Sequence, residues 1–372
     1  MLTSLADITA ARRIVVKIGS ALLVGGGTPR EDWLTRMASD LAMLRRGGAQ
    51  VIVVSSGAIA LGAARLGLAK GGRGSLADAQ AAAAVGQIAL ADLWSRALAS
   101  EGITAAQMLL TLGDLEDRRR YLNASATLDR LLEAGVIPVI NENDSVATEE
   151  IRFGDNDRLA ARVAQAANAD LVLLLSDVDG LYDRDPREAG AALIPVVDAV
   201  TPEVMAMASG ASSSGLGSGG MVSKLQAGQI ATRAGIALAI LNGTHDAPIT
   251  QALAAGTGTL FLPVRADSAR KAWLGGRLAP AGELRVDKGC AEALKGGASL
   301  LAAGVVGVSG MFRRGDLVSV VSMKGERLAQ GLAEYDSAEV QLIAGKRAED
   351  QAERLGYTPR SCVIHRDHMV LL

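Results

Sequence analysis

The fold is indicated first by the stretch Val15-Val16-Lys17-Ile18-Gly19-Ser20. The run of apolar residues is typical of a β-strand that is buried on both faces of a sheet. A lysine inside such a strand must bring its ammonium to a partner at the end of the strand. That partner is either a buried carboxylate, in a purely structural ion pair, or a bound phosphate. The open backbone at Gly19 and Ser20 favours the phosphate.

The same pattern recurs through the first two thirds of the chain. Further short apolar runs are expected to be strands: Val51–Val54, Val136–Ile140, Leu171–Leu175 and Ala237–Leu241, with Arg13–Ile18 as the first. Between them lie stretches with helical spacing: Glu31–Arg46, Ala79–Ser100 and Asp157–Ala167. Buried strands that alternate with helices predict an α/β fold with a mainly parallel sheet sandwiched by helices. In such sheets, ligands bind at the carboxyl ends of the strands.

The length of 372 residues exceeds the size at which one hydrophobic core usually stops growing, so two domains are expected. A stretch rich in proline and glycine at 263–280 separates them. Beyond it the segments are shorter, with glycine-rich turns and β-type runs such as Leu317–Val321 and Val363–Ile364. We therefore expect a catalytic domain at 1–262, a linker at 263–280 and a small, mostly β domain at 281–372.

Composition excludes several classes of protein. The net charge of −2 argues against binding of a polyanion through bulk electrostatics. The amino-terminal residues lack the features of a signal peptide, and the apolar runs are too short to span a bilayer. Cys290 and Cys362 cannot form a disulfide framework, so they indicate buried thiols and a cytoplasmic location. His365 and His368 have no neighbouring thiol or carboxylate cluster in the sequence, which predicts no metal site.

Polar clusters follow several of the predicted strands. They are Ser55-Ser56-Gly57, Asn141-Glu142-Asn143-Asp144, Gly154-Asp155-Asn156-Asp157 and Ser176-Asp177-Val178-Asp179-Gly180. Hydroxyls and backbone N–H groups can bind a carboxylate or phosphate, whereas carboxylates and amides can bind an ammonium, orient a lysine or hold Mg²⁺. The serine and glycine cluster is also typical of an ordinary helix cap, and for either of the clusters at 141–144 and 154–157 taken alone a solvated loop is favoured.

A glycine-rich stretch at 212–224 ends in Lys224, where an apolar helical pattern begins. Flexible amides, a helix amino terminus and an ammonium together form an anion site. The stretch formally matches the dinucleotide fingerprint, but a serine-rich loop precedes it and no acidic residue follows at the required distance. It is not a Walker A loop. A flexible linker remains the alternative, and the helix that opens beside Lys224 argues against it.

These segments together resemble the glutamate 5-kinase family. The resemblance is carried by Val16–Ser20, Ser55–Ala60, Gly86-Gln87, Gln107–Thr111, Val139–Asp144, Gly154–Asp157, Leu181-Tyr182, Gly217–Met221 with Lys224, and Ala281–Glu283. It covers nearly the whole chain. It implies an amino-acid-kinase catalytic domain followed by a PUA-like domain, and transfer of a phosphoryl group from ATP to the γ-carboxylate of L-glutamate in proline biosynthesis.

The resemblance also implies roles for individual residues. Lys17, Lys224 and Asp157 would be catalytic, with the carboxylate orienting the two lysines. Glutamate would be bound by Ser56, Asn141, Asp144 and Asn156. ATP would be bound by Lys17, Gly19, Ser20, Ser176, Asp177, Ser218, Gly219, Gly220, Met221, Val222, Ser223 and Lys224. Ser218 and Ser223 stand where threonines are expected, and both keep the hydroxyl.

The chemistry agrees with this set of residues. A glutamate side chain has a reference pKa of about 4.3 and is already ionised at neutral pH, so no general base is needed. The obstacle is repulsion between an anionic nucleophile and a polyanionic phosphate, which two lysines and Mg²⁺ relieve. The resemblance further implies inhibition by proline and a homo-oligomer, either a dimer or a tetramer.

Two alternatives stay open at this point. The chain could be another amino-acid kinase, with aspartate, acetylglutamate, carbamate or UMP as acceptor. The PUA-like domain could bind RNA, but residues 281–372 hold 12 Lys/Arg and 12 Asp/Glu, a net charge of zero. Because RNA binding favours a strongly basic surface, a structural or regulatory role for this domain is expected instead.

Overall fold

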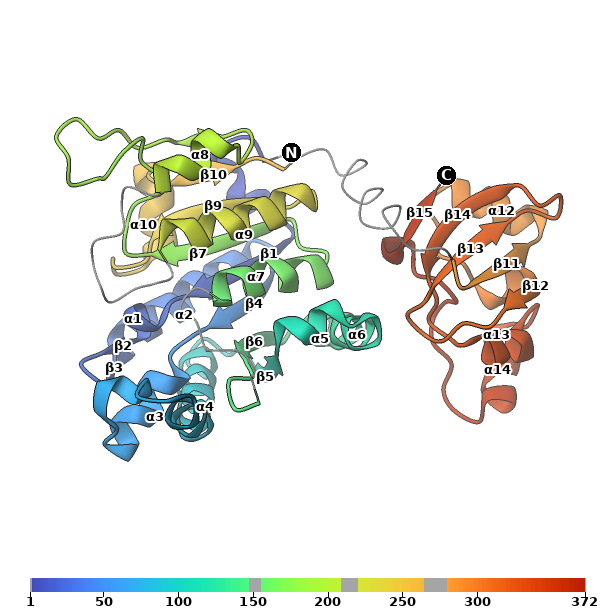
Figure 1. Cartoon of the computed structure of the whole chain (residues 1–372), viewed down its shortest axis with the longest axis horizontal. Helices are drawn as coiled ribbons and strands as arrows, with labels where there is room; N and C mark the ends of the chain where they lie inside the picture. The colour runs from blue at the N-terminus through green and yellow to red at the C-terminus, as the bar shows by residue number, and fades with distance from the viewer. Residues whose placement is uncertain (1, 147–154, 209–219, 264–279, 372) are drawn as a thin grey trace. The chain divides into compact units, whose positions relative to one another are not determined.

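The computed structural model describes residues 2–146, 155–208, 220–263 and 280–371 (Figure 1). The chain divides into two compact units. The larger comprises 1–116 and 123–266, and the smaller comprises 117–122 and 267–372. Most of the predicted linker at 263–280 lies outside the described residues.

The larger unit is built on an eight-stranded sheet with the order β5-β6-β4-β1-β7-β9-β10-β8. The six strands from β5 to β9 are mutually parallel, whereas β10 runs antiparallel to β9 and parallel to β8. The predicted parallel sheet is confirmed. Its strands are β1 (Arg13–Ile18), β4 (Gln50–Ser55), β5 (Ala105–Leu110), β6 (Ile137–Glu142), β7 (Leu171–Ser176), β8 (Val196–Val197), β9 (Ala237–Asn242) and β10 (Thr259–Phe261).

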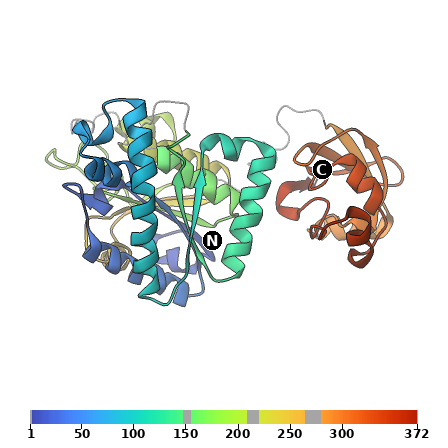
Figure 2. The ribbon, with the colours of Figure 1, turned by 90° about the horizontal axis from the view of Figure 1, so that it is seen from below.

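Helices cover both faces of this sheet (Figure 2). Alternate residues of β1, β4, β7 and β9 share one core with α2, α4 and α10, while α7 and α9 pack against each other and against strands. The helices are α1 (Ser20–Leu23), α2 (Glu31–Arg46), α3 (Ala58–Leu66), α4 (Leu76–Ala99), α5 (Leu112–Glu116), α6 (Arg118–Glu133), α7 (Asp155–Ala166), α8 (Pro202–Met207), α9 (Met221–Arg233) and α10 (Pro248–Ala255). Short elements complete the unit: η1 (Leu5–Ala10), η2 (Ala69–Gly72), β2 (Val24–Gly25) and β3 (Thr28–Pro29).

The smaller unit is a five-stranded sheet, in the order β12-β11-β13-β14-β15, with its own hydrophobic core. This confirms a small, mostly β carboxy-terminal part. Its elements are β11 (Gly282–Val286), α12 (Lys288–Lys295), η4 (Ala302–Gly304), β12 (Val305–Gly310), β13 (Leu317–Val321), β14 (Arg327–Leu332), α13 (Ser337–Ile343), α14 (Ala348–Leu355), η5 (Arg366–His368) and β15 (Met369–Leu371). The prediction of a strand at Val363–Ile364 is wrong, because that segment makes only an isolated β-bridge between Ile364 and Leu300.

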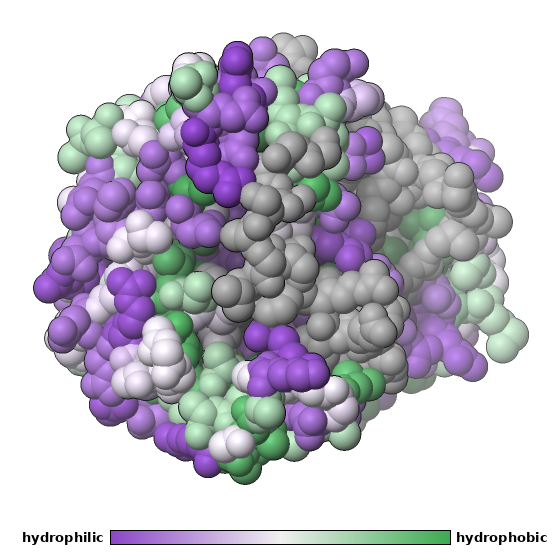
Figure 3. Space-filling model, turned by 60° about the vertical axis from the view of Figure 1, so that its left-hand side comes forward, coloured by the Kyte–Doolittle hydropathy of each residue, from purple (hydrophilic) through white to green (hydrophobic). Residues whose placement is uncertain are grey.

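The surface is mixed in character. On the face shown in Figure 3, hydrophilic residues predominate and hydrophobic ones occur in small groups, as on most globular proteins. Among the described residues, every helix is too short or too polar to cross a membrane.

Candidate active site

Three buried, charged side chains meet at the carboxyl end of β1. Val16 and Ile18 face the core shared with α2, so the alternation of a strand directs Lys17 to the other face, where α7 lies. There Nζ of Lys17 lies 2.6 Å from Oδ1 of Asp157, in the first turn of α7. Nζ of Lys224, in the first turn of α9, lies 3.3 Å from Oδ2 of the same carboxylate. Of the two partners considered for Lys17, the structure shows the buried carboxylate, which holds it beside a second lysine.

This triad carries a net positive charge in a buried place. Lys17 is 7% exposed, Asp157 0% and Lys224 8%. Two ammonium groups and one carboxylate give the triad a formal net charge of 2 − 1 = +1. Burial alone would raise the pKa of Asp157, but the charges of Lys17 and then Lys224 hold it below its usual value. Burial lowers the pKa of Lys17, and Asp157 opposes that shift. Two ammonium groups gathered beside one carboxylate are suited to binding an anion.

Other predicted residues surround the triad. The backbone at Gly19 is close to Lys17, since a Cβ built there would lie 3.7 Å from Nζ. Asp177, directly after β7, is near enough for its charge to raise the pKa of Lys17, and Ser176 donates to it at 3.2 Å. Ser223 was predicted to bind ATP, and its hydroxyl lies 2.9 Å from Oδ2 of Asp157. The amino termini of α7 and α9 also meet here, and their partial positive charges favour an anion.

A second cluster, of amides and a hydroxyl, adjoins the triad. Nδ2 of Asn156 donates to Oγ of Ser56 at 2.6 Å and to Oδ1 of Asn141 at 3.1 Å. Nδ2 of Asn141 in turn donates to Oε1 of Gln87 at 2.8 Å. The predicted glutamate residues Ser56, Asn141 and Asn156 are thereby brought together from the ends of β4 and β6 and the start of α7. Asn156 immediately precedes Asp157, so the two clusters are neighbours.

Asp144 was also predicted to bind glutamate. It follows the end of β6 and lies near Arg73, which precedes α4. Burial lowers the pKa of Arg73, and the charge of Asp144 raises it, so the two side chains interact electrostatically. Among the remaining predictions, Ser20 begins α1, Gly220 caps α9 and Met221 and Val222 open it. Ser218 and Gly219 lie outside the described residues.

Sequence reasoning assigned no role to Gln87 or Arg73. Gln87 lies on an alanine-rich helix whose composition gives no clear apolar stripe, so its direction could not be inferred. The signal that could have located it is a pair of helical glycines. A Cβ on Gly62 would lie 1.8 Å from the carbonyl oxygen of Ala82, and one on Gly86 would lie 1.8 Å from that of Ala58. Such glycines mark a close crossing of α3 and α4.

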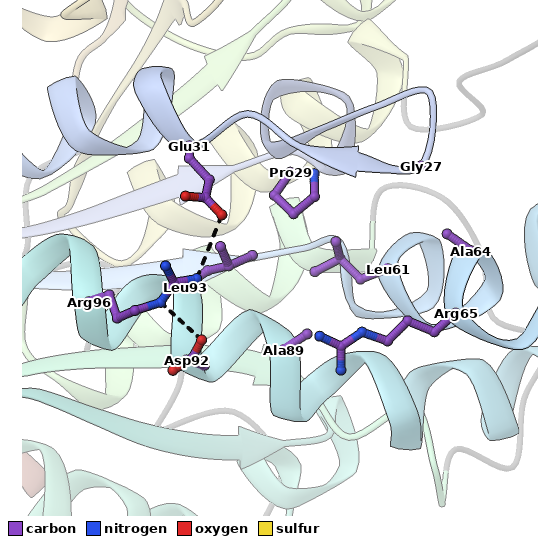
Figure 4. Close-up of a pocket in the computed structure, with 10 residues that line it drawn as sticks. All are labelled: Gly27, Pro29, Glu31, Leu61, Ala64, Arg65, Ala89, Asp92, Leu93 and Arg96. Carbon is purple, nitrogen blue, oxygen red and sulfur yellow. Dashed lines mark hydrogen bonds and ion pairs between the residues drawn. The ribbon is translucent and has the colours of Figure 1, made fainter.

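A pocket of about 310 Å³ lies elsewhere in the larger unit, between the β2–β3 hairpin and helices α2, α3 and α4 (Figure 4). It contains none of the predicted site residues. Arg96 pairs there with Asp92 at 3.0 Å and with Glu31 at 3.7 Å, on an exposed surface. The pocket therefore shares no residue with the lysine and amide clusters.

Comparison with known proteins agrees with the geometry. A model described as the amino acid kinase family matches residues 12–242, and one described as the PUA domain matches residues 282–355. Glutamate 5-kinase of Novosphingobium aromaticivorans is 64% identical over 375 residues, with 100% of both chains covered. The chain belongs to the glutamate 5-kinase family. The resemblance inferred from the motifs is thus confirmed, together with the kinase and PUA domain classes.

Other relatives and a solved structure extend the comparison. Glutamate 5-kinase of Sphingopyxis alaskensis is 61% identical, covering 97% of each chain. That of Zymomonas mobilis is 54% identical, covering 97% of this chain and 91% of the other. Carbamate kinase from Giardia lamblia bound to AMP-PNP is 13% identical, with a TM-score of 0.49 over 69% of this chain and 100% of that one.

Proposed function

We propose that this chain transfers the γ-phosphoryl group of ATP to the γ-carboxylate of L-glutamate, the first step of proline biosynthesis. A bond forms between a carboxylate oxygen and the γ-phosphorus, the bond from that phosphorus to the β–γ bridging oxygen breaks, and the products are γ-glutamyl phosphate and ADP. The observation that carries the proposal is the buried Lys17–Asp157–Lys224 triad. The names of the relatives supply the acceptor.

In this mechanism, Lys17 and Lys224 neutralise the negative charge of the transferring phosphoryl group. Asp157 orients both ammonium groups toward that phosphoryl group. The acceptor carboxylate arrives ionised, so the protein needs to align it rather than deprotonate it. We assign glutamate binding to Ser56, Asn141, Asp144 and Asn156. Asn156 supports this role because its buried Oδ1 has no hydrogen-bond partner among the described residues, leaving an acceptor for the substrate's ammonium.

The nucleotide would lie along the ends of β1 and β7 and the start of α9. We assign its binding to Lys17, Gly19, Ser20, Ser176, Asp177, Ser218, Gly219, Gly220, Met221, Val222, Ser223 and Lys224. Residues 1–262 would form the catalytic domain, 263–280 the linker and 281–372 the PUA-like domain.

Mg²⁺ enters the proposal as the partner of the ATP phosphates. In the part of the chain that the structure describes, no three His, Cys, Asp or Glu side chains are grouped to hold a metal ion. Both oxygens of Asp157 already contact lysines. Since Mg²⁺ in kinases is bound largely by phosphate and water, we assign it no protein ligand and no separate step. Inhibition by proline, a dimer or tetramer, a cytoplasmic location and the absence of RNA binding stay predictions.

The test is an assay of ADP release with five acceptors: glutamate, aspartate, acetylglutamate, carbamate and UMP. We expect the highest kcat/KM with glutamate. The variant Lys17→Ala, prepared in the same way, gives the background, because it removes the shortest ion pair of the triad. A higher kcat/KM with any other acceptor, or wild-type turnover by Lys17→Ala, would refute the proposal.

A further inference from the structure

The side chains of Gln87, Asn141, Asn156 and Ser56, here called the amide relay, form a directed chain of hydrogen bonds. Oε1 of Gln87 accepts from Nδ2 of Asn141, and Oδ1 of Asn141 accepts from Nδ2 of Asn156. A second hydrogen on Nδ2 of Asn156 is donated to Oγ of Ser56. Because each amide has one donor end and one acceptor end, the orientation of one fixes the orientation of the next.

The direction of the relay decides what Asn156 offers to a ligand. Both of its N–H groups are engaged inside the protein, and its buried Oδ1 is left without a hydrogen-bond partner in the described residues. A buried acceptor in this condition destabilises the protein until a donor binds. With the opposite direction, Asn156 would present an N–H group instead. The relay therefore makes this position select a ligand that donates hydrogen bonds.

The backbone at Gln87 is held in place by a tight helix crossing. It follows Gly86, whose missing side chain lets α4 approach the carbonyl oxygen of Ala58. Ala58 begins α3 only two residues after Ser56. The two ends of the relay are thus tied to one tight helix crossing, which limits independent movement of Gln87 and Ser56. Asn141, in the middle, is only 2% exposed.

We propose that Gln87 is a positioning residue for amino-acid selectivity, which keeps Asn156 oriented to accept a hydrogen bond from the α-ammonium of the acceptor. The inference rests on the proposed function, because it assumes that glutamate is the acceptor. Gln87 acts through Asn141 and does not itself touch the substrate.

The test compares Gln87→Met, which keeps the length of the side chain and removes its acceptor, with Gln87→Glu, whose carboxylate only accepts. Gln87→Met should raise the KM for glutamate about tenfold, equivalent to about 1.4 kcal/mol, with the KM for ATP unchanged. Gln87→Glu should restore the KM for glutamate. Gln107→Met, the same change at an exposed position of the edge strand β5, is the matched control.

A substrate analogue tests the direction of the relay. Glutarate lacks the α-amino group, so its binding, measured as acceptor or as competitive inhibitor, should differ between wild type and Gln87→Met by no more than about twofold. An unchanged KM for glutamate in Gln87→Met would overturn the inference. An equal loss of glutarate binding in Gln87→Met would also overturn it. So would a Gln87→Glu variant that unfolds at the wild-type temperature but does not restore the KM for glutamate. A wild-type enzyme inactive on glutamate would instead refute the proposed function.

Discussion

Replacement of Lys224 by methionine isolates the contribution of one positive charge to the reaction. The side chain is 8% exposed, and its Nζ lies 3.3 Å from Asp157. In the variant, the net charge of the triad falls from +1 to 1 − 1 = 0, while the 2.6 Å pair between Lys17 and Asp157 remains. The buried carboxylate therefore stays compensated, and we expect the variant to fold.

The expected loss of kcat follows from the removal of one positive charge beside the phosphoryl group. Two unit charges about 4 Å apart interact by about 4 kcal/mol at an effective dielectric constant of about 20. Loss of one preorganised donor to a developing anion costs about 10²- to 10³-fold in kcat in other enzymes. The two values agree, so we expect kcat to fall about 10²- to 10³-fold. The KM for glutamate should stay near the wild-type value, because the amide relay that holds the acceptor is intact.

The measurement is steady-state ADP release with glutamate and ATP varied in turn. Lys70→Met is the matched control, since Lys70 is an exposed lysine of the same unit. A kcat for Lys224→Met within about tenfold of the wild type, in a folded protein, would contradict the charge argument, because one charge would then contribute less than about 1.4 kcal/mol.

Three further changes test the stability of the larger unit. Gly86→Ala places a Cβ 1.8 Å from a backbone oxygen of α3 and should lower the free energy of unfolding by about 1–3 kcal/mol or more. The control Gly113→Ala, whose Cβ would have its nearest neighbour at 3.7 Å, should leave the free energy of unfolding unchanged. Equal urea midpoints for the two variants would refute this prediction. Asp157 has a lowered pKa, so the stability that it contributes is present above its unfolded pKa of about 3.9 and is lost as the pH falls through its folded pKa. Asp157→Asn should thus flatten the decline of stability below about pH 4 in urea titrations, and an unchanged decline would exclude this role. Arg96→Ala removes only exposed ion pairs and should change stability by less than about 1 kcal/mol in the same assay; a larger loss would show that the pairs in Figure 4 act as a network.

Strands and helices with continuous or periodic apolar residues could be predicted closely. The bounds of β1 and α2 agree with the sequence-based expectation, because burial of these elements leaves a clear pattern in their residues. The edge strand β5 was not predicted. It has a neighbour on one side only and is partly exposed, so Gln107 and its neighbours form no continuous apolar run.

The site could be predicted as a set of residues but not as a geometry. Lys17 and Lys224 are far apart in the sequence, and only the shared position of one strand end and two helix starts brings them to one carboxylate. Local patterns report burial and turns, whereas the pairing of distant side chains depends on how the helices pack on the sheet. Gln87 shows the limit most clearly, since its partner Asn141 is 54 residues away, on another element.

The order of Asn156 and Asp157 at the start of α7 links the two halves of the reaction. Asn156 belongs to the relay around Ser56, and Asp157 holds the two lysines. Consecutive Cα atoms are about 3.8 Å apart, so one peptide unit fixes the spacing between the residue that we propose binds the acceptor and the residue that we propose orients the two lysines. Phosphoryl transfer requires the reacting atoms to approach to about 3–3.5 Å, and small displacements reduce the rate steeply. Since both residues lie in the first turn of one helix, any shift of α7 moves them together and keeps the spacing between them.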